Sequence, residues 1–256
     1  MAAPTVLVTR PRREALRWVE DLRGAGITAE ALPLIAIEPL ADPARLRAEW
    51  QALPPQDAWM FVSAAAAEHF LRAVGDQQPA ALRCWASGPG TAAALRAAGV
   101  PAEAIDAPPA DAPQFDSEHL LAQVAPQLRA GLRVLIVRGA DASGRIAGRD
   151  WLARRLAQAG VACSELAAYR RLPPEFDEEA RRLALEGAAG RALFLFSSSE
   201  AVDNLRRALP DADWHAGRAL ATHERIGEAA RGAGFGEVRV CRPTLAALVA
   251  SIESFG

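Results

Sequence analysis

Short apolar runs alternate with amphipathic segments along most of the chain. The run at residues 5–9 predicts a buried strand, and the apolar positions of residues 12–25 recur at helical spacing before a pair of glycines. Residues 27–37 predict a second strand that continues through Pro33. Apolar strands that alternate with helices are typical of parallel sheets covered on both faces. We therefore expect an α/β fold.

The same alternation continues to the end of the chain. It predicts further strands over residues 58–62, 82–86, 133–137, 163–169, 191–196 and 238–241. It predicts helices over residues 64–74, 91–98, 148–159, 200–209, 225–233 and 245–252. The proline-rich segment 101–113 predicts a loop.

An internal repeat relates the two halves of the chain. Phe61 begins the sequence FVS and Phe196, 135 residues later, begins FSS; Gly99 and Gly234 are separated by the same 135 residues. In each copy a strand leads to small hydroxyl residues and a helix, and a second strand leads to a helix that ends at glycine. This pattern predicts two similar α/β units.

A second pair of similar strands indicates that the two copies are circularly permuted. Residues 6–10 (VLVTR) begin the chain, whereas their counterpart at residues 134–138 (VLIVR) follows the first repeat copy. The simplest explanation is one domain inserted into another. We expect a discontinuous domain of residues 1–37 and 172–256, an inserted domain of residues 40–168, and linker strands near residues 33–40 and 167–173.

Composition restricts the chemistry. The chain has 256 residues, a net charge of −2 and no strongly basic segment, so nothing in it favours nucleic acid or a membrane surface as a partner. All 29 basic residues are arginine, which excludes lysine Schiff-base chemistry and P-loop reactions that depend on lysine. Anions would be bound by arginine, hydroxyl groups and helix N-termini.

Cysteine and histidine spacing favours neither a disulfide framework nor a metal site. The three cysteines, Cys84, Cys163 and Cys241, are far apart and odd in number, which is typical of buried thiols in a reducing compartment. The four histidines lack paired ligand spacing. The N-terminus has no signal-peptide apolar core, and no run of about 18 apolar residues predicts a membrane span. We expect a cytoplasmic protein.

In a parallel sheet, ligands gather at the carboxyl ends of the strands, where helix N-termini present free N–H groups. Small, hydroxyl and arginine residues recur at these positions: Thr9, Arg10, Ser63, Ala64, Gly88, Thr91, Arg138, Gly139, Ser197, Ser198 and Thr222. Each by itself is more often a helix cap. Because they recur in both halves, they predict a binding site for an anionic small molecule.

Tyr169 is the only tyrosine, and it ends a predicted strand beside the proposed linker. Its ring could be a partly buried packing residue with a solvated hydroxyl, or the hydroxyl could be a proton donor. The residues alone leave both interpretations open. The glycine-rich segments 87–91 and 139–144 lack the spacing of a dinucleotide fingerprint and the lysine of a P-loop, so no nucleotide cofactor is expected.

Six segments in this order resemble the uroporphyrinogen-III synthase family, and the resemblance spans nearly the whole chain. They are VLVTRPRREALRWVEDLRGAGITAEALPLIAIEP, WMFVSAAAAEHFL, ASGPGTAAALRAAGV, VLIVRGADASGRIAGRDWLARRLAQAGVACSELAAYRR, FLFSSSEAVDNL and RGAGFGEVRV. The resemblance implies two flavodoxin-like parallel-sheet lobes joined by a two-stranded linker.

The resemblance further implies a cofactor-free lyase that closes the linear tetrapyrrole hydroxymethylbilane, with loss of water and inversion of ring D. Protonation of the hydroxymethyl group would release water and leave an azafulvene cation. The ring D carbon that already carries the bridge would attack it, giving a spiro-pyrrolenine that opens and recloses inverted. Such a reaction needs one acid and a fold that bends the substrate.

Site residues are carried over by position. Tyr169 matches the family's linker tyrosine, the candidate acid. Ser63 and Ala64 match positions whose backbone amides hold substrate carboxylates, and Thr91 matches the hydroxyl after the glycine-rich turn.

The other lobe departs from the family pattern, because Ile226 stands where a threonine is often found and Thr222 is the nearest hydroxyl. Ser197 and Ser198 match the second strand-end pair. The remaining candidates at the rim are Thr9, Arg10 and Arg138.

The expected partner is the linear tetrapyrrole, with a transient transfer from hydroxymethylbilane synthase as a further expectation. Two other classes stay open from the residues. A two-lobed protein could bind an anionic small molecule without chemistry, and a flavodoxin-like module could serve regulation. A response regulator would need an acidic cluster at the strand ends together with a lysine, and the chain has no lysine.

Overall fold

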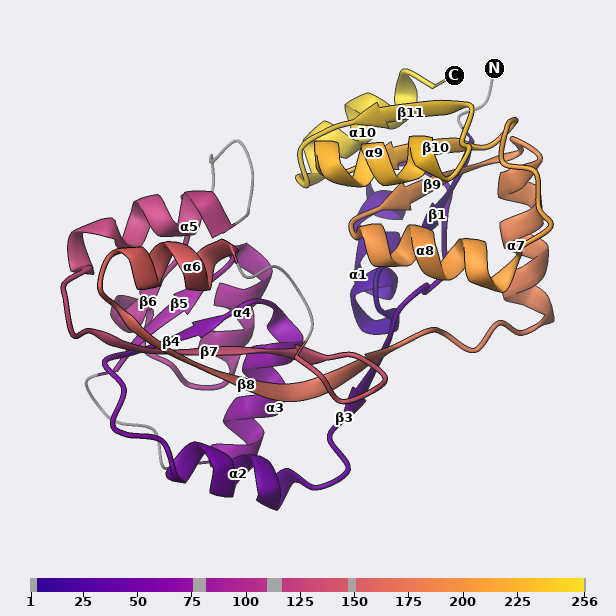
Figure 1. The fold of residues 1–256 in the computed structure, drawn as a ribbon. Helices are drawn as coiled ribbons and strands as arrows, with labels where there is room; N and C mark the ends of the chain where they lie inside the picture. Colours follow the sequence, from indigo (N-terminus) through magenta and orange to yellow (C-terminus); the bar gives the residue numbers. More distant parts are fainter. Residues whose placement is uncertain (1–3, 76–81, 110–116, 147–150, 256) are drawn as a thin grey trace. The chain divides into compact units, whose positions relative to one another are not determined.

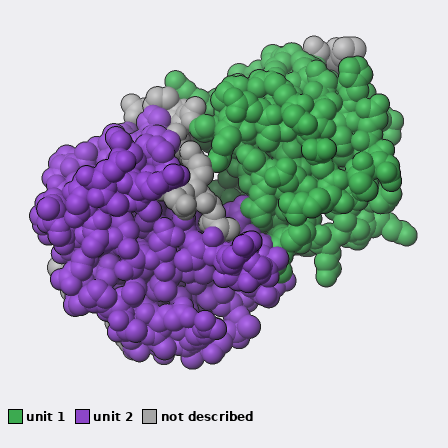
Figure 2. Space-filling view, in the orientation of Figure 1, with its two compact units in different colours: residues 1–36, 172–256 green, residues 37–171 purple. Residues whose placement is uncertain are grey.

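The computed structural model describes residues 4–75, 82–109, 117–146 and 151–255. The chain divides into two compact units (Figure 2). Unit 1 contains residues 1–36 and 172–256, and unit 2 contains residues 37–171. Each unit has its own β-sheet (Figure 1), so the predicted α/β class with two parallel sheets is confirmed.

Unit 1 contains a five-stranded sheet in the order β11-β10-β9-β1-β2, with every neighbouring pair parallel. Its strands are β1 (Thr5–Val8), β2 (Ala29–Ala31), β9 (Ala192–Phe196), β10 (Arg218–Ala221) and β11 (Glu237–Val240). Its helices are α1 (Arg12–Gly24), α7 (Glu178–Ala188), α8 (Ser199–Ala208), α9 (Glu224–Gly232) and α10 (Leu245–Glu253).

Unit 2 contains a six-stranded sheet in the order β3-β8-β7-β4-β5-β6. Its strands are β3 (Ala36–Pro39), β4 (Ala58–Phe61), β5 (Arg83–Ala86), β6 (Ile105–Asp106), β7 (Arg133–Ala140) and β8 (Ala162–Leu172). Its helices are α2 (Pro43–Gln51), α3 (Ala64–Val74), α4 (Pro89–Ala97), α5 (Ser117–Val124) and α6 (Trp151–Gln158), with short 3₁₀ turns at Ala102–Ala104 and Ala125–Gln127.

Helices cover both faces of the unit 2 sheet, as its continuous apolar strands require. Helices α2, α3 and α4 contribute Leu46, Phe70 and Leu95 to the core on one face. Helices α5 and α6 contribute Leu120 and Leu156 to the core on the other. Burying apolar side chains on both faces is the main driving force for this arrangement.

In unit 1, alternate strand residues also serve two different cores. Leu193 and Leu195 of β9 pack with α1 and α10 on one face. Phe194 and Phe196 point to the other face, where they stack on each other and meet Phe235 edge to face. The period of two along β9 therefore separates an aliphatic core from an aromatic one.

The two sheets are circularly permuted copies of each other. The order β2-β1-β9-β10-β11 of unit 1 matches β8-β7-β4-β5-β6 of unit 2, with β3 added at the edge. The register agrees as well, because Val8 pairs with Leu195 as Ile136 pairs with Met60. Leu195 follows Met60 by the same 135 residues that separate the two copies of the sequence repeat.

Several predicted elements need correction. Residues 27–37 do not form one strand: β2 ends before Pro33, which has no N–H to continue the ladder, and β3 belongs to the other sheet. The chain also contains α2, α5, α7 and β10, which the pattern did not predict. Segment 101–113 is not only a loop, because it includes β6. Its residues 110–113 lie outside the described residues, and so do residues 148–150 of the helix predicted over residues 148–159.

Two further points concern composition. Of the three cysteines expected to be buried, only Cys84 is fully buried, whereas Cys163 and Cys241 are partly exposed. Within the described residues, no helix has the length and apolar character needed to cross a membrane.

The aromatic core of unit 1 requires a glycine in α7. A Cβ at Gly187 would overlap the ring of Phe194 and lie 3.2 Å from Leu7 Cδ1. We predict that Gly187→Ala lowers the free energy of unfolding by about 1–3 kcal/mol, the usual effect of overpacking. The control is Gly232→Ala at the end of α9, where an added Cβ would have no neighbour within 4 Å. Equal stability of both variants in urea titrations would contradict the prediction.

Candidate functional site

Two neighbouring strands of unit 2, β4 and β5, end at the same edge of the sheet, and candidate residues follow each of them there. Strand β4 leads to Ser63, which caps α3 by accepting a hydrogen bond from the N–H of Ala66 at 3.1 Å. The first turn of α3 presents N–H groups without intrahelical partners, so this end of the helix favours anions. The predicted strand-end position of Ser63 and Ala64 is therefore observed.

Tyr169 lies against this helix end. Its side chain is only 1% exposed, so it is not the half-exposed aromatic of the simpler interpretation. Its hydroxyl oxygen lies 3.0 Å from Ser63 Oγ, and its ring stacks on the imidazole of His69 with centroids 5.9 Å apart. The structure thus brings together the candidate acid and the candidate cap.

A bulge in β8 turns Tyr169 toward α3. Arg138 pairs with Ala167 but Gly139 pairs with Tyr169, which leaves Ala168 as an extra residue. In a regular strand Ala168 and Tyr169 would point to opposite faces. Here both pack in the core formed with α2, α3 and α4, because the extra residue reverses the alternation.

Gly139 makes room for the tyrosine ring. A Cβ at this position would lie 2.8 Å from Tyr169 Cζ and 3.1 Å from its hydroxyl oxygen. Arg138, Gly139 and Tyr169 do not end their strands as the sequence predicted, because β7 continues to Ala140 and β8 continues to Leu172. Arg138 is 6% exposed, and its Nη1 lies 3.2 Å from Glu165 Oε2 on the neighbouring strand.

The glycine-rich turn after β5 carries a pair of hydroxyl groups. Ser87 Oγ and Thr91 Oγ1 are 3.2 Å apart, and the N–H of Ser87 donates to Phe61 O of β4. Gly88 is the N-cap residue of α4, and Thr91 is 5% exposed. Thr91 therefore has its hydroxyl turned toward Ser87 in the interior of this turn.

The candidates of unit 1 take several different positions. Thr9 donates its hydroxyl to Leu195 O at 2.7 Å, and Arg10 pairs with Glu14 at 3.2 Å while its guanidinium lies over the Trp18 ring. Both groups are engaged within the unit. Their polar atoms therefore stabilise the fold around β1 and α1.

The other unit 1 candidates remain at the carboxyl ends of β9 and β10. Ser197 and Ser198 are partly exposed, and Ser198 is the N-cap residue of α8 without a side-chain capping bond. Thr222 is 8% exposed, and its N–H donates to Phe196 O as that of Ser87 donates to Phe61 O. Thr222 is therefore the counterpart of Ser87.

Two titratable groups near the edge have shifted pKa values. Burial lowers the pKa of His69, and the positive charge of Arg72 lowers it further. The hydroxyl of Ser143 donates to Asp141 and holds the pKa of that carboxyl below its usual range. His69 is therefore neutral and Asp141 ionised at neutral pH.

His69 and Ala168 were not among the site residues predicted from the sequence, whereas Ser87 begins the glycine-rich segment 87–91 that follows a predicted strand. His69 lies six residues after Ser63 on a helix predicted to start there, so its position could have been found. The bulge at Ala168 left no signal in the sequence, because it depends on how β8 pairs with β7.

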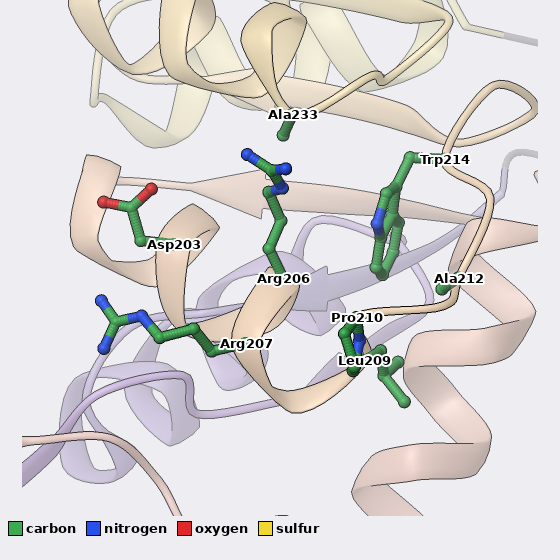
Figure 3. A pocket seen from close by; sticks show the side chains of 8 residues that line it. All are labelled: Asp203, Arg206, Arg207, Leu209, Pro210, Ala212, Trp214 and Ala233. Carbon is green, nitrogen blue, oxygen red and sulfur yellow. The ribbon is translucent and has the colours of Figure 1, made fainter.

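A cavity of about 600 Å³ lies elsewhere in unit 1 (Figure 3). It is lined by Asp203, Arg206 and Arg207 of α8, by Trp214, and by Ala233 after α9. The last turn of a helix that follows a parallel strand lies at the amino ends of the strands, where basic side chains favourably oppose the helix dipole. This cavity is therefore at the opposite edge of its sheet from Ser198 and Thr222.

No group of three or more histidine, cysteine, aspartate or glutamate side chains in the described part of the chain is arranged to hold a metal ion. Among the candidate residues at or near the strand ends, the polar groups are hydroxyls, backbone N–H groups and arginines. Such groups bind carboxylates or phosphates and can move a proton.

Comparison with known proteins decides the family. Residues 17–250 match the family described as uroporphyrinogen-III synthase HemD. The chain belongs to the uroporphyrinogen-III synthase family. The expected resemblance is confirmed.

A uroporphyrinogen-III synthase from Chlorobaculum parvum (strain DSM 263 / NCIMB 8327) is 30% identical over 186 residues, which cover 69% of this chain and 68% of the relative. Two solved structures have the same fold. The uroporphyrinogen-III synthetase of Helicobacter pylori 26695 is 14% identical with a TM-score of 0.62 and covers 100% of both chains. A mutant uroporphyrinogen III synthase from the extremely thermophilic bacterium Thermus thermophilus is 21% identical with a TM-score of 0.56 and covers 99% of this chain and 97% of its own.

The approach of Gly139 to Tyr169 can be tested directly, because the chain has one tyrosine. We predict that Gly139→Ala displaces the ring and shifts its NMR signals in protein labelled with ¹³C-tyrosine. The control is Gly24→Ala at the end of α1, where an added Cβ would meet nothing within 4 Å. An unchanged tyrosine spectrum in Gly139→Ala would show that the ring does not depend on this close approach.

Proposed function

We propose that the protein converts hydroxymethylbilane to uroporphyrinogen III, with loss of water and inversion of ring D. Membership in the family supports the reaction, and the pair formed by Tyr169 and Ser63 supports the assignment of the acid. The alternative of a binding protein without chemistry is not favoured by membership in a family of synthases.

The hydrogen bonds of Ser63 leave Tyr169 able to donate its proton. Ser63 Oγ accepts from the N–H of Ala66 and can donate its own hydrogen to the phenol oxygen. The phenol hydrogen is then directed away from Ser63 and would be free for transfer to the leaving hydroxyl of the substrate. After the transfer, the same Ser63 hydroxyl would stabilise the phenolate.

The proposed reaction balances with this one acid. Tyr169 gives a proton to the hydroxymethyl oxygen, the C–O bond breaks, and water leaves an azafulvene cation. The bridged carbon of ring D attacks, the spiro intermediate opens, and the new cation closes on the free α carbon of ring D. That carbon loses its proton, which restores the phenol. The sequence involves no net oxidation or reduction, so we propose a cofactor-free lyase.

Substrate carboxylates would bind at the helix ends. We propose Ser63 with Ala64, Gly88, Ser197 and Ser198 for this role, because they begin helices at strand carboxyl ends. Four candidates whose side chains already contact protein groups would contribute less: Thr9, Arg10, Thr91 and Arg138. The same holds for Gly139, which lies against the Tyr169 ring, and for Thr222, which is buried and whose N–H donates to Phe196 O.

The same proposal includes the source of the substrate and the cellular compartment. Hydroxymethylbilane closes spontaneously to the wrong isomer, so rapid transfer from hydroxymethylbilane synthase would protect the yield. The three cysteines are free thiols, which supports a reducing compartment such as the cytoplasm.

The reaction is tested by generating hydroxymethylbilane in situ from porphobilinogen and its deaminase. The products are oxidised, and the type I and type III isomers are separated. Type III product in proportion to added protein is the expected result. Type I product alone, from folded protein, would refute the proposed function and favour the binding protein.

The acid is tested by Tyr169→Phe, which keeps the ring and removes the hydroxyl. We predict that kcat falls by about 10²–10⁴-fold, the usual contribution of a general acid. Stability should change little, because Ser63 keeps its bond to Ala66. Thermal melting serves as the control, and unchanged turnover in a stable variant would remove Tyr169 from the mechanism.

A further inference from the structure

The imidazole of His69 lies against the face of the candidate acid. His69 is on α3, six residues after the cap Ser63, and its ring is inclined by 25° to that of Tyr169 with centroids 5.9 Å apart. This is within the range of stacked aromatic pairs. No other aromatic ring of the described residues stacks on Tyr169.

A hydrogen bond to Ser63 cannot hold the plane of the tyrosine ring. The phenol oxygen lies on the axis about which the ring rotates at χ2, so it stays in place when the ring turns. The phenol hydrogen, by contrast, prefers the ring plane because the oxygen lone pair is conjugated with the ring. The orientation of the ring therefore decides where the proton points.

Contacts with the ring itself must fix that orientation. Gly139 admits one edge of the ring, since a Cβ there would lie 2.9 Å from Tyr169 Cε2. The stacked imidazole constrains the plane. Within the described residues, no hydrogen bond of His69 competes with this stacking, and Tyr169 is its one aromatic neighbour.

The electrostatic state of His69 suits this role. Burial and Arg72 lower its pKa, so at neutral pH it places no positive charge against the phenol. A neutral imidazole constrains the ring without favouring early loss of the proton. The groups on its own helix that act on its charge are Arg72 and Glu68.

We infer that His69 is a positioning residue, which fixes the ring plane of Tyr169 and so aims the proton given to the substrate. The inference rests on the proposed function, in which Tyr169 is the acid. It assigns His69 no contact with substrate. It also predicts that a flat apolar ring can replace the imidazole.

The test compares His69→Ala, which removes the stack, with His69→Phe, which keeps a flat ring. In His69→Ala, kcat should fall by roughly 3- to 10-fold with little change in KM, in line with the contribution of an aromatic pair. His69→Phe should keep most of kcat. Combined with Tyr169→Phe, His69→Ala should cause no further loss, because no proton remains to be aimed.

The single tyrosine provides a second readout without substrate. In ¹³C-tyrosine spectra, His69→Ala should shift the ring signals and speed ring flipping, and His69→Phe should restore slow flipping. Thermal melting identifies a variant that loses activity only because it unfolds. If His69→Ala unfolds, the activity and ring signals of His69→Phe test the role of His69.

The outcomes separate the two proposals. Unchanged kcat and ring signals in His69→Ala, with an inactive Tyr169→Phe, would overturn the role of His69 and leave the acid in place. An equal loss in the Tyr169→Phe background would also overturn it, because His69 would then act elsewhere. Full activity of Tyr169→Phe would overturn both the assignment of Tyr169 as the acid and the role of His69. Absence of type III product from the unmodified protein would overturn the proposed function.

Discussion

Parallel pairing brings the carboxyl ends of neighbouring strands to one edge of each sheet, and the candidate site depends on this constraint. In unit 2 it places the end of β4, where Ser63 begins α3, two strands away from β8, which carries Tyr169. Helices that return over the sheet must start at this edge, so their unpaired N–H groups face the same region. The proposed acid and the proposed anion-binding groups thus lie near one another without any long-range adjustment of the backbone.

The two units share one permuted sheet, and the site lies where unit 2 departs from it. In unit 1, β1 ends at Val8 and β2 has three residues, whereas in unit 2 their counterparts β7 and β8 have eight and eleven. The extension of β7 and β8 carries the bulge at Ala168 and the ring of Tyr169 beyond the repeat. Divergence from a common sheet is therefore concentrated at the proposed acid.

The sequence could predict those features that depend on local pattern. The apolar runs located β1, β4 and β9 to within a residue or two, and helix α3 to its observed ends, because each combines a strong period with a clear cap or turn. Element α7 was not predicted, although Asp177 caps it, since its sequence is rich in charge and alanine. Strand β10 was missed because RALA has neither β-branched nor aromatic residues.

The candidate site was predictable in its parts but not in its contacts. Hydroxyl residues after strands identified Ser63, and the single tyrosine drew attention to Tyr169. Their hydrogen bond depends on one extra residue in β8, which no local pattern encodes. Arg138 was misplaced for a related reason, since pairing with β8 prolongs β7 past the apolar run that predicted it.

The distribution of charge at the candidate site favours binding of substrate carboxylates by uncharged groups, the hydroxyls and the helix N-termini. Arg10 and Arg138, the two arginines among the candidates, are each paired with a glutamate of the same unit. Hydroxyls and helix N-termini carry only partial charges, so each binds a carboxylate more weakly than a free guanidinium would. A substrate with many carboxylates can gain affinity from several such contacts. Because each contact is weak, breaking any one of them costs little free energy when the product dissociates. Beside the phenol of Tyr169 the same principle holds, because its two polar neighbours on α3, the Ser63 hydroxyl and the neutral His69 ring, orient the side chain without adding a full charge.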